Sequence, residues 1–545
     1  MLPFRRSLPI AALAAVAVIL AGCAGGTAAP EEEAATVEGG TLVYATGDAE
    51  PTCLDPHVGG NYPQGLISTQ YLEPLVGRSA DGEIEPWLAT EWEATDDGLT
   101  WNLALRDDVS FTDGTPFDAA AVKANIEHLQ DPDTASSTGY LSVKEIDEVE
   151  VVDDAHVRFH LSTPKSALLE VLSQQWSAME SPAGIERGQE ENCAAPIGTG
   201  PFIVESWAPQ DRVVMTRNDD YVPTNPQRDH DGPAHVDTLE WRFIPDAATR
   251  QAALASGEVH VIDNPLPTDI AAAEAQGIEH LDAPRPASAN RIELNTAQAP
   301  FDDARVREAF IRSADPNPGI ESLFRGTAER SYSALSSVEP MGVSDEALFA
   351  TDPEAANELL DEAGWTERND DGVRMKGGET LTVRFPVSTN QSTEAEQSLF
   401  EQIQANTAAV GFDVELNPVD LSTWYGALAA HEYEAVSAPY TTVGPDVLRI
   451  LYHSDSTVPA PSGYFANNAQ LTLPELDGLL EDALRTTDDA ERTELYAQAQ
   501  EIILGSFAVL PLYDQQNHFL YKGVTGVDAL HTIATPLLLN AQLTK

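Results

Sequence analysis

The sequence predicts an α/β fold with mixed sheets that is divided over two or three domains. Short apolar or alternating segments, typical of β-strands, are followed throughout by longer segments with apolar residues at helical spacing. The sequence has no internal repeat of fixed period. The chain has 545 residues, more than one ordinary hydrophobic core encloses. The order of the segments therefore predicts the fold class, and the length predicts several domains.

The first 23 residues have the pattern of an export signal. Arg5 and Arg6 precede an apolar segment from Leu8 to Leu20, which is shorter than the ~20 residues of a bilayer span and suits a signal peptide. This segment ends in Leu20-Ala21-Gly22-Cys23, which resembles the lipobox of bacterial lipoproteins. The resemblance implies a lipoprotein signal peptide over residues 1–22, lipidation of Cys23 and anchoring on the extracytoplasmic face of the cell membrane. A plain secretory signal followed by an accidental cysteine is the alternative.

Residues 23–38 predict a disordered tether between the lipid and the folded body. Apart from Cys23, they are mainly Ala, Gly, Thr, Pro and Glu, with almost no large apolar side chain. Such a segment does not bury enough apolar surface to offset the entropy cost of folding.

The net charge excludes nucleic acid as a partner. With 30 Lys and Arg against 88 Asp and Glu, the formal charge is 30 − 88 = −58. A surface of this sign repels phosphates and offers no basic patch to anionic lipids. It indicates either a highly soluble secreted or salt-adapted surface or a sink for cationic ligands.

The two cysteines that remain after Cys23, Cys53 and Cys193, predict a disulfide, because an exported protein folds in an oxidising compartment. A bridge that closes so long a loop contributes about 4–5 kcal/mol in the chain-entropy model. Two unpaired buried thiols are the alternative.

The folded body is expected to begin with a strand at residues 39–45. Leu54-Asp55-Pro56 follows as an extended segment and turn, because the residue before a proline avoids the helical region. The glycine-rich segment from His57 to Tyr62 is then a loop at a strand end, where open α/β sheets place ligands. Asn61 and Tyr62 are therefore candidate ligand-binding residues.

Strands separated by Asp-Gly turns are predicted between residues 86 and 117, and Asp118 caps the helix that follows. A further strand with alternating apolar residues ends near Leu161; His156 and His160 share its other face but lack a third metal ligand. Ser162-x-x-Lys165 has the serine–lysine spacing of penicillin-binding enzymes, but Pro164 argues against the helix turn that this chemistry needs.

The segment Pro196-Ile197-Gly198-Thr199-Gly200-Pro201-Phe202 predicts a tight, partly locked turn ahead of paired strands. It is not a nucleotide loop, because it lacks a third glycine and a Gly-Lys-Ser/Thr sequence. Beyond it, the pattern predicts strands at 239–243, 259–262, 381–385, 412–416 and 509–513, and helices from 246 to 257, from 352 to 364 and around 399–403, 476–480 and 495–503.

The order of these motifs resembles the extracellular solute-binding proteins of the peptide/nickel class, which feed ABC importers. The resemblance spans residue 39 to about residue 513. It rests on the Gly39-Gly40-Thr41-Leu42 start, Leu54-Asp55-Pro56, the segments 86–117 and 196–221, and the segment 294–310.

The resemblance implies a two-lobed, hinged periplasmic-binding-protein fold with mixed sheets and an additional inserted domain. Lobe I is expected to comprise residues 39–75, 196–290 and 505–545, the inserted domain residues 76–195, and lobe II residues 291–504. Such a protein is a monomeric receptor that captures a solute by hinge closure and delivers it to a membrane permease driven by separate ATPase subunits. It has no enzymatic activity, and neither a cofactor nor a metal is expected.

The sequence departs from the peptide binders of this class at one residue. In peptide binders of this class an aromatic residue is followed three positions later by an Asp that pairs with the peptide ammonium. Here Tyr440 is followed by Val443, so either Asp446 takes this role or the ligand has no ammonium. Trp424 and Tyr440 either line the cleft or pack in the core, and Asp446 is either a ligand contact or a turn or cap residue.

We expect a peptide or peptide-like ligand, with a nickel chelate, an oligosaccharide or an opine as alternatives. A secreted serine–lysine hydrolase that uses Ser162 is the competing class.

Overall fold

The computed structural model describes residues 35–437 and 439–545. The predicted signal peptide, Cys23 and most of the predicted tether lie outside the described residues. The end of that tether is ordered: β1 (Thr36–Val37) pairs antiparallel with β26 (Gln542–Thr544), which also pairs with β23 (Val524–Thr525). The prediction of a disordered tether up to residue 38 was therefore wrong for Thr36 and Val37, because the C-terminal strand pairs with their backbone.

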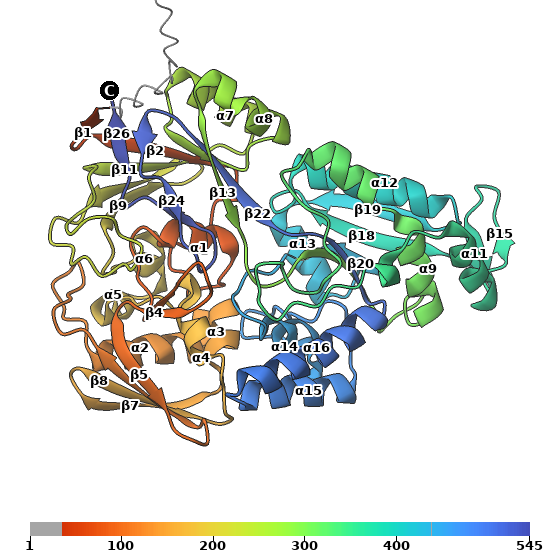
Figure 1. The fold of residues 1–545 in the computed structure, drawn as a ribbon, viewed down its shortest axis with the longest axis horizontal. Coiled ribbons are helices and arrows are strands. Elements are labelled where there is room, and N and C mark those ends of the chain that lie inside the picture. Colours follow the sequence, from red (N-terminus) through yellow and green to blue (C-terminus); the bar gives the residue numbers. More distant parts are fainter. Residues whose placement is uncertain (1–34, 438) are drawn as a thin grey trace, which may run out of the picture. The chain divides into compact units, whose positions relative to one another are not determined.

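The first lobe is built on a seven-stranded mixed sheet. β2 lies at its centre, parallel to β11 on one side and to β12 on the other. Figure 1 shows β13 and β22 side by side, running from this sheet toward the second lobe. The strand order is β13 (Glu279–Pro284), β22 (Gln516–Tyr521), β12 (Val261–Asp263), β2 (Thr41–Thr46), β11 (Thr238–Phe243), β10 (Arg212–Arg217) and β9 (Phe202–Ala208).

The predicted insertion adds a four-stranded antiparallel sheet of order β5 (Ala89–Ala94), β6 (Thr100–Leu105), β8 (His156–Leu161) and β7 (Ile146–Asp153). α2 (Ala119–Gln130) packs on it and begins at the predicted cap, Asp118, whose side chain accepts from the amide of Ala121. Apolar residues of this sheet and of the seven-stranded sheet form one continuous core. Around them lie α1 (Tyr62–Ser68), α3 (Thr138–Val143), α4 (Leu168–Leu172), α5 (Pro182–Glu186), α6 (Gln189–Ala194), α7 (Ala247–Ser256), α8 (Pro267–Ala273) and the short pairs β3 (Val76–Arg78) with β4 (Ile84–Pro86) and β24 (Asp528–Ala529) with β25 (Pro536–Leu537).

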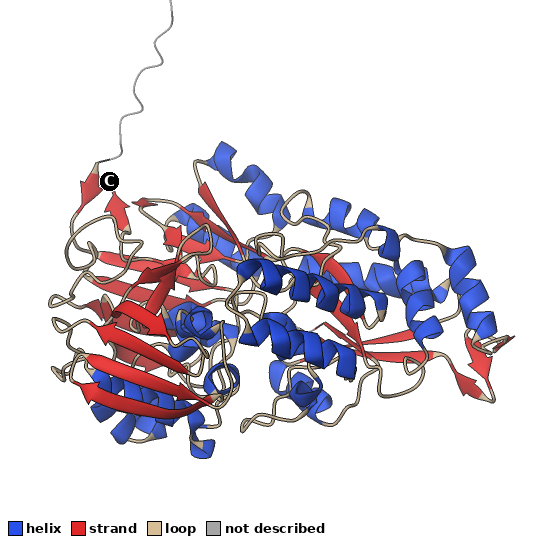
Figure 2. Ribbon diagram, turned by 60° about the horizontal axis from the view of Figure 1, so that its bottom comes forward, coloured by secondary structure: helices blue, strands red, loops and turns tan. Residues whose placement is uncertain are grey.

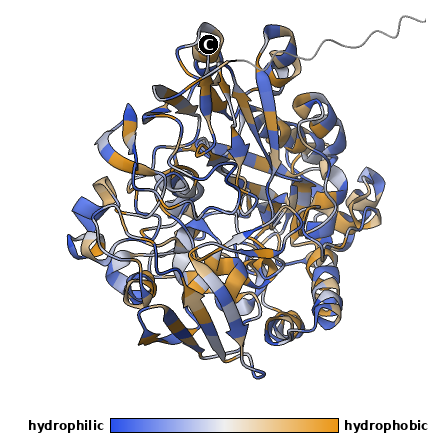
Figure 3. Cartoon of the chain, turned by 60° about the vertical axis from the view of Figure 1, so that its left-hand side comes forward, coloured by the Kyte–Doolittle hydropathy of each residue, from blue (hydrophilic) through white to orange (hydrophobic). Residues whose placement is uncertain are grey.

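The second lobe has its own core, formed by residues between Ala287 and Tyr513 with Leu141 from the insertion. Figure 2 shows strands gathered in the first lobe and long helices over the second. Many of these helices carry both hydrophilic and hydrophobic stretches (Figure 3), as expected for helices with one buried side. The sheets are β20 (Ala435–Ser437), β14 (Asn290–Leu294) and β21 (Val509–Tyr513); β18 (Thr382–Ser388) and β19 (Asp413–Val419); and β15 (Glu367–Arg368), β16 (Arg374–Lys376) and β17 (Glu379–Thr380). The helices are α9 (Ala304–Ala314), α10 (Asn317–Gly319), α11 (Pro353–Glu362), α12 (Glu394–Ala408), α13 (Leu421–Ala429), α14 (Val447–Tyr452), α15 (Pro474–Arg485) and α16 (Asp489–Gly505).

The chain crosses between the two cores twice, between β13 and β14 and between β21 and β22. β21 pairs with β14 and belongs to the second core, so the predicted return to lobe I at residue 505 was too early. An apolar strand such as Val509–Tyr513 fits either sheet, and only its pairing partner decides its lobe.

The predicted turn at 196–202 lies against the backbone of Tyr71. The amide of Gly200 donates to the Tyr71 carbonyl oxygen at 3.1 Å, and the amide of Phe202 donates to the Gln70 carbonyl at 3.1 Å. A Cβ on Gly200 would lie 2.6 Å from the Tyr71 carbonyl carbon, and a Cβ on Gly198 would collide with the Tyr71 carbonyl oxygen. The glycines are thus required by close backbone approach.

Candidate functional site

Two adjoining cavities of about 380 and 440 Å³ lie between the lobes. The residues that line both come from each side: Asp48, Tyr62 and Arg285 from the first lobe, and Gln391 and Pro439 from the second. Such volumes fall within the range of small-molecule pockets, about 300–1,000 Å³. The two cavities together are called the cleft below.

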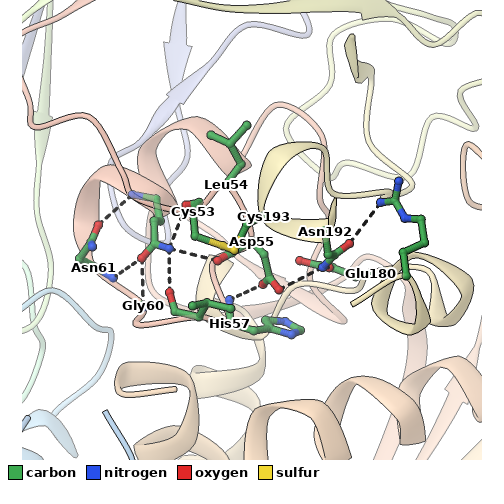
Figure 4. The surroundings of a disulfide bond; sticks show 12 residues. Cys53, Leu54, Asp55, His57, Gly60, Asn61, Glu180, Asn192 and Cys193 are labelled. Atoms are coloured by element: carbon green, nitrogen blue, oxygen red, sulfur yellow. Dashed lines mark hydrogen bonds between the residues drawn. A yellow bond between two sulfur atoms is a disulfide. The ribbon is translucent and has the colours of Figure 1, made fainter. Parts of the chain in front are cut away.

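One wall of the cleft is the loop that precedes α1, where the sequence predicted ligand contacts. Asn61 caps α1, and the Gln64 carboxamide closes the capping box, accepting from the amides of Gly60 and Asn61 at 3.0 and 2.9 Å (Figure 4). The Gln64 amide group donates to the carbonyl oxygens of Cys53, Asp55 and Val58. One side chain therefore holds the loop in shape, and Asn61 and Tyr62 both line the cleft.

Arg285 is a cation of the cleft that forms no ion pair within the described ranges. Its guanidinium carbon lies 4.1 Å from the centre of the Tyr62 ring, and it donates to the hydroxyl of Thr441. Its Nε is buried without a hydrogen-bond partner, and Arg285 forms no ion pair with any residue that the structure describes. A planar guanidinium in this condition is suited to bind a carboxylate of a solute.

Asp48 is a carboxylate of the same cleft. Its side chain accepts from the amide of Asn264 at 3.3 Å and forms no ion pair within the described ranges. The pKa of Asp48 is raised to about 7, chiefly because the cleft walls exclude water and also because Asp263 lies nearby, while Arg285 opposes the shift. Among the described residues no cation lies within ion-pair distance of Asp48, and a ligand ammonium would provide one.

The opposite wall is aromatic and comes from the second lobe, with Tyr425, Tyr440, Tyr464 and Phe465 lining the smaller cavity. Trp176 completes this cavity from the insertion. Its indole Nε1 and the Gln391 carbonyl oxygen are buried without hydrogen-bond partners in the described chain. Because buried polar groups are normally paired, these atoms mark positions where a solute would bind.

Two predicted ligand residues lie elsewhere. Trp424 is buried in a small apolar cluster with Leu428 and Tyr433, and it presents its ring to Tyr425 at 5.1 Å between ring centres. Asp446 is fully buried at the start of α14 and accepts from two nitrogens of Arg449, each at 2.9 Å. The charge of Asp446 is therefore compensated by Arg449 of its own helix. Neither Trp424 nor Asp446 is among the described residues that line the cleft.

Val443, at the position where peptide binders carry an acid, is buried beside Trp176 and Ile533. Asp48 and Arg285 were not predicted from the sequence as residues of the cleft. Asp48 follows the central parallel strand, a position that could have indicated it. Arg285 stands at a chain crossing and belongs to no motif.

The serine–lysine pair does not have the arrangement of a nucleophile and base. Lys165 is buried and donates to the Glu145 carboxylate at 2.8 Å and to the Ser142 carbonyl at 2.6 Å. The hydroxyl of Ser162 donates to the Glu145 carbonyl at 3.2 Å. His156 and His160 are paired with Asp153 and Glu150 on the face of the insertion's sheet.

Cys53 and Cys193 form a disulfide with their Cα atoms 4.4 Å apart, which joins the chain before the cleft loop to α6 (Figure 4). Among the helices of residues 35–437 and 439–545, none is both long and apolar enough to cross a membrane.

Comparison with known proteins agrees with this architecture. Residues 83–461 match the model of bacterial extracellular solute-binding proteins, family 5. The glutathione-binding protein GsiB of Salmonella paratyphi A is 29% identical over 474 residues, which are 85% of this chain and 86% of that protein. NikA from Brucella suis in complex with Fe(III)-EDTA superposes with a TM-score of 0.78 at 27% identity, over 93% of this chain and 100% of NikA. A dipeptide-binding protein from Pseudoalteromonas sp. SM9913 in complex with Met-Leu gives a TM-score of 0.81 at 22% identity, over 93% and 100%. The chain belongs to the bacterial extracellular solute-binding proteins of family 5, and it is a two-lobed binding protein rather than an enzyme.

Proposed function

We propose that this chain is the extracytoplasmic, lipid-anchored receptor of an ABC importer and that it captures short peptides or peptide-like solutes bearing a free carboxylate. Cys23 carries the lipid, and the segment before Thr36 links it to the folded body. The protein acts as a monomer. The loaded lobes dock on the membrane permease, and separate ATPase subunits drive transport.

The observation that carries the ligand class is the pair of opposite charges in the cleft. Arg285 and Asp48 both line the cavities, and neither forms an ion pair with the residues that the structure describes. A solute with a carboxylate and an ammonium would bind both through charge-assisted hydrogen bonds, worth about 1.5–3 kcal/mol each.

The named ligands of the relatives are consistent with an anionic anchor. Glutathione, bound by the Salmonella relative, and EDTA, bound as its iron chelate by the Brucella protein, both carry more than one carboxylate. Arg285 would engage this shared group, whereas Asp48 would select for a solute that also carries an ammonium. A peptide-like solute satisfies both side chains, and a chelate satisfies only Arg285.

Capture follows from the two crossings of the chain between the lobes. Arg285 follows directly on β13, at the start of one crossing, and Gln391 and Tyr440 lie in the second lobe. A solute that contacts both walls stabilises the arrangement in which they face each other, so it shifts the population toward the closed form. The closed form is the one that a permease would recognise.

Isothermal titration calorimetry of the purified full chain with glutathione tests this proposal. We expect binding that Arg285→Gln weakens by about 10–100-fold, since one charge-assisted contact is lost. The matched control is Arg325→Gln, because Arg325 is exposed on the second lobe.

Equal affinity in both variants would refute the role of Arg285. Tight binding of Fe(III)-EDTA without binding of glutathione would show that the ligand class is a metal chelate and not a peptide-like solute. Metabolic labelling with a fatty acid, lost in Cys23→Ser, tests the anchor independently.

A further inference from the structure

A second group of polar residues lies outside the cleft, behind the loop that lines it. Asp55 and His57 precede that loop, and His128 belongs to the last turn of α2. One carboxylate oxygen and one ring nitrogen of each histidine all lie within 4.8 Å of one another. Asp55 and His57 are fully buried, whereas the side chain of His128 is 15% exposed.

The ring of His57 is held with one nitrogen free. Its Nε2 lies 2.9 Å from the carbonyl oxygen of Ala178. Since a carbonyl oxygen only accepts, Nε2 carries the proton and Nδ1 presents a lone pair. This Nδ1 is buried and has no hydrogen-bond partner in the described part of the chain. An orphaned acceptor at such depth calls for a cation or donor that the protein itself does not supply.

His128 has a polar partner on each ring nitrogen. Its Nδ1 lies 3.0 Å from the hydroxyl of Thr134, and its Nε2 faces the Asp55 carboxylate at 3.3 Å. A carboxylate only accepts, so without an ion Nε2–H donates to Asp55 and Nδ1 accepts from the Thr134 hydroxyl. An ion would displace this proton, so that Nδ1–H donates to Thr134 and the lone pair of Nε2 faces the ion beside the carboxylate. In metal sites, ligating histidines donate their second ring N–H to an oxygen acceptor. His57 already has this arrangement, and His128 would reach it when its proton moves to Nδ1.

The surroundings also hold two buried carboxyl groups, Asp55 and Glu180. Asn192 Nδ2 donates to both the Asp55 and the Glu180 carboxylates, and one oxygen of Glu180 is buried without a partner (Figure 4). Neither carboxylate forms an ion pair with a lysine or arginine of the described ranges. A cation bound beside Asp55 would balance the charge of this buried carboxylate.

We propose that Asp55, His57 and His128 form a site for one divalent transition-metal ion of the zinc class. Two imidazole nitrogens and one carboxylate are the ligands that such ions prefer, and the exposed edge of His128 offers the path of entry. The fourth position is filled by water. The site is structural, and it is separate from the solute cleft.

The consequence of this site is a fixed cleft wall. Asp55 and His57 lead into the Gly59–Tyr62 loop, and Ser137 and Thr138, which also line the smaller cavity, follow Thr134 along the chain. Gly59 and Ser136 form a bridge between the two segments. An ion bound by Asp55 and His128 would join the same two segments a second time.

A second cluster, Asp229, His230 and His235, has a similar spacing. None of its side chains has a buried polar atom without a partner in the part of the chain that the structure describes. Both nitrogens of His230 are already engaged, Nδ1 with Asp229 and Nε2 with the Pro233 carbonyl, each at 2.8 Å. This surface cluster therefore serves as the matched control.

The test is a zinc titration of the full chain, stripped with a chelator, against a chromophoric zinc indicator, with metal content measured by mass spectrometry. We expect one equivalent of Zn²⁺ with submicromolar affinity, unchanged in His230→Ala. His57→Ala should weaken binding at least 100-fold, and Zn²⁺ should raise the melting temperature of the wild type but not of this variant.

His128→Gln provides a second variant if His57→Ala does not fold, because residue 128 is partly exposed and Gln still donates to Asp55. The proposal is overturned if the wild type binds no stoichiometric zinc, or if binding survives in the variants of the buried site and is lost in His230→Ala. These outcomes are independent of whether glutathione binds the cleft.

Discussion

Asp48 and Asp446 are two aspartates from opposite lobes, and their surroundings give them different chemistry. Asp446 accepts two hydrogen bonds from Arg449, so its charge is satisfied inside the protein. Asp48 accepts one hydrogen bond, from the side-chain amide of Asn264, and its desolvation disfavours the charged form. A cation bound beside it would stabilise that form. Of the two aspartates, Asp48 is therefore the one that we expect to respond to a ligand.

This difference predicts a pH dependence of solute binding. Because the pKa of Asp48 is raised to about 7, a proton competes with the ligand ammonium below that pH. The affinity for a zwitterionic solute should fall about tenfold from pH 8 to pH 6, since one proton must be released on binding. Calorimetry at several pH values measures this.

Asp48→Asn is the corresponding variant. It should bind more weakly at pH 8 and lose the slope between pH 8 and pH 6. A wild type whose affinity is the same at both values would contradict the role of Asp48 as the ammonium partner.

At the scale of single elements, local signals predicted the structure well. Asp246 caps α7, which ends at Gly257 in the left-handed conformation, and Asp352 with Pro353 begins α11. These signals need only neighbours in the sequence. By contrast, the lobe to which β21 belongs depends on a partner more than 200 residues away, which no local pattern contains.

The turn at 196–202 gives a test at this scale. Gly198→Ala should lower the free energy of unfolding by about 3 kcal/mol or more, because the new methyl group meets the Tyr71 backbone, which does not move without breaking the hydrogen bond to Gly200. Urea denaturation monitored by fluorescence measures the loss.

Gly478→Ala is the control for the same chemical change. Gly478 lies within α15 with open space around it, so alanine there should stabilise the protein by about 0.5–1 kcal/mol. If Gly198→Ala behaves like Gly478→Ala, close packing is not the reason for the glycine.

For the whole molecule, the buried carboxyl of Glu396 predicts how stability varies with pH. Glu396 accepts from Asn290 at 2.9 Å, and burial raises its pKa to about 7 from an ordinary value of 4.5. The folded state therefore holds a proton that the unfolded chain releases between pH 4.5 and pH 7. The stabilisation that this proton confers is lost as the pH rises through this window.

Glu396→Gln should thus raise the free energy of unfolding at pH 8 by about 1–3 kcal/mol and change it little at pH 5. Thermal unfolding of the ligand-free protein at both pH values measures the effect, and Glu394→Gln, the same change at an exposed position two residues earlier, is the control. An equal effect at pH 5 and pH 8 would contradict the proton assignment.

The same contrast of scale explains which parts of the cleft were predictable. Asn61, Tyr62 and Tyr440 line the cleft, in agreement with the prediction for the first two and with one of the two alternatives for Tyr440. These positions were predictable because glycine-rich strand ends and aromatic segments are visible in the sequence. Arg285 in the cleft was not predicted, and neither was the Asp55–His57–His128 group outside it. Their partners come from segments that only the folded chain brings together.

The two crossings between the lobes have a consequence for how the chain is organised. Asn290 and Tyr513, the first residue of β14 and the last of β21, are register partners. The second lobe therefore leaves and re-enters the first at neighbouring points, the geometry of one domain spliced into a loop of another. Residues 290–513 could therefore be removed as one continuous segment that carries its own core and its own aromatic wall. The two cut ends of the remaining chain lie close enough to be joined by a short linker.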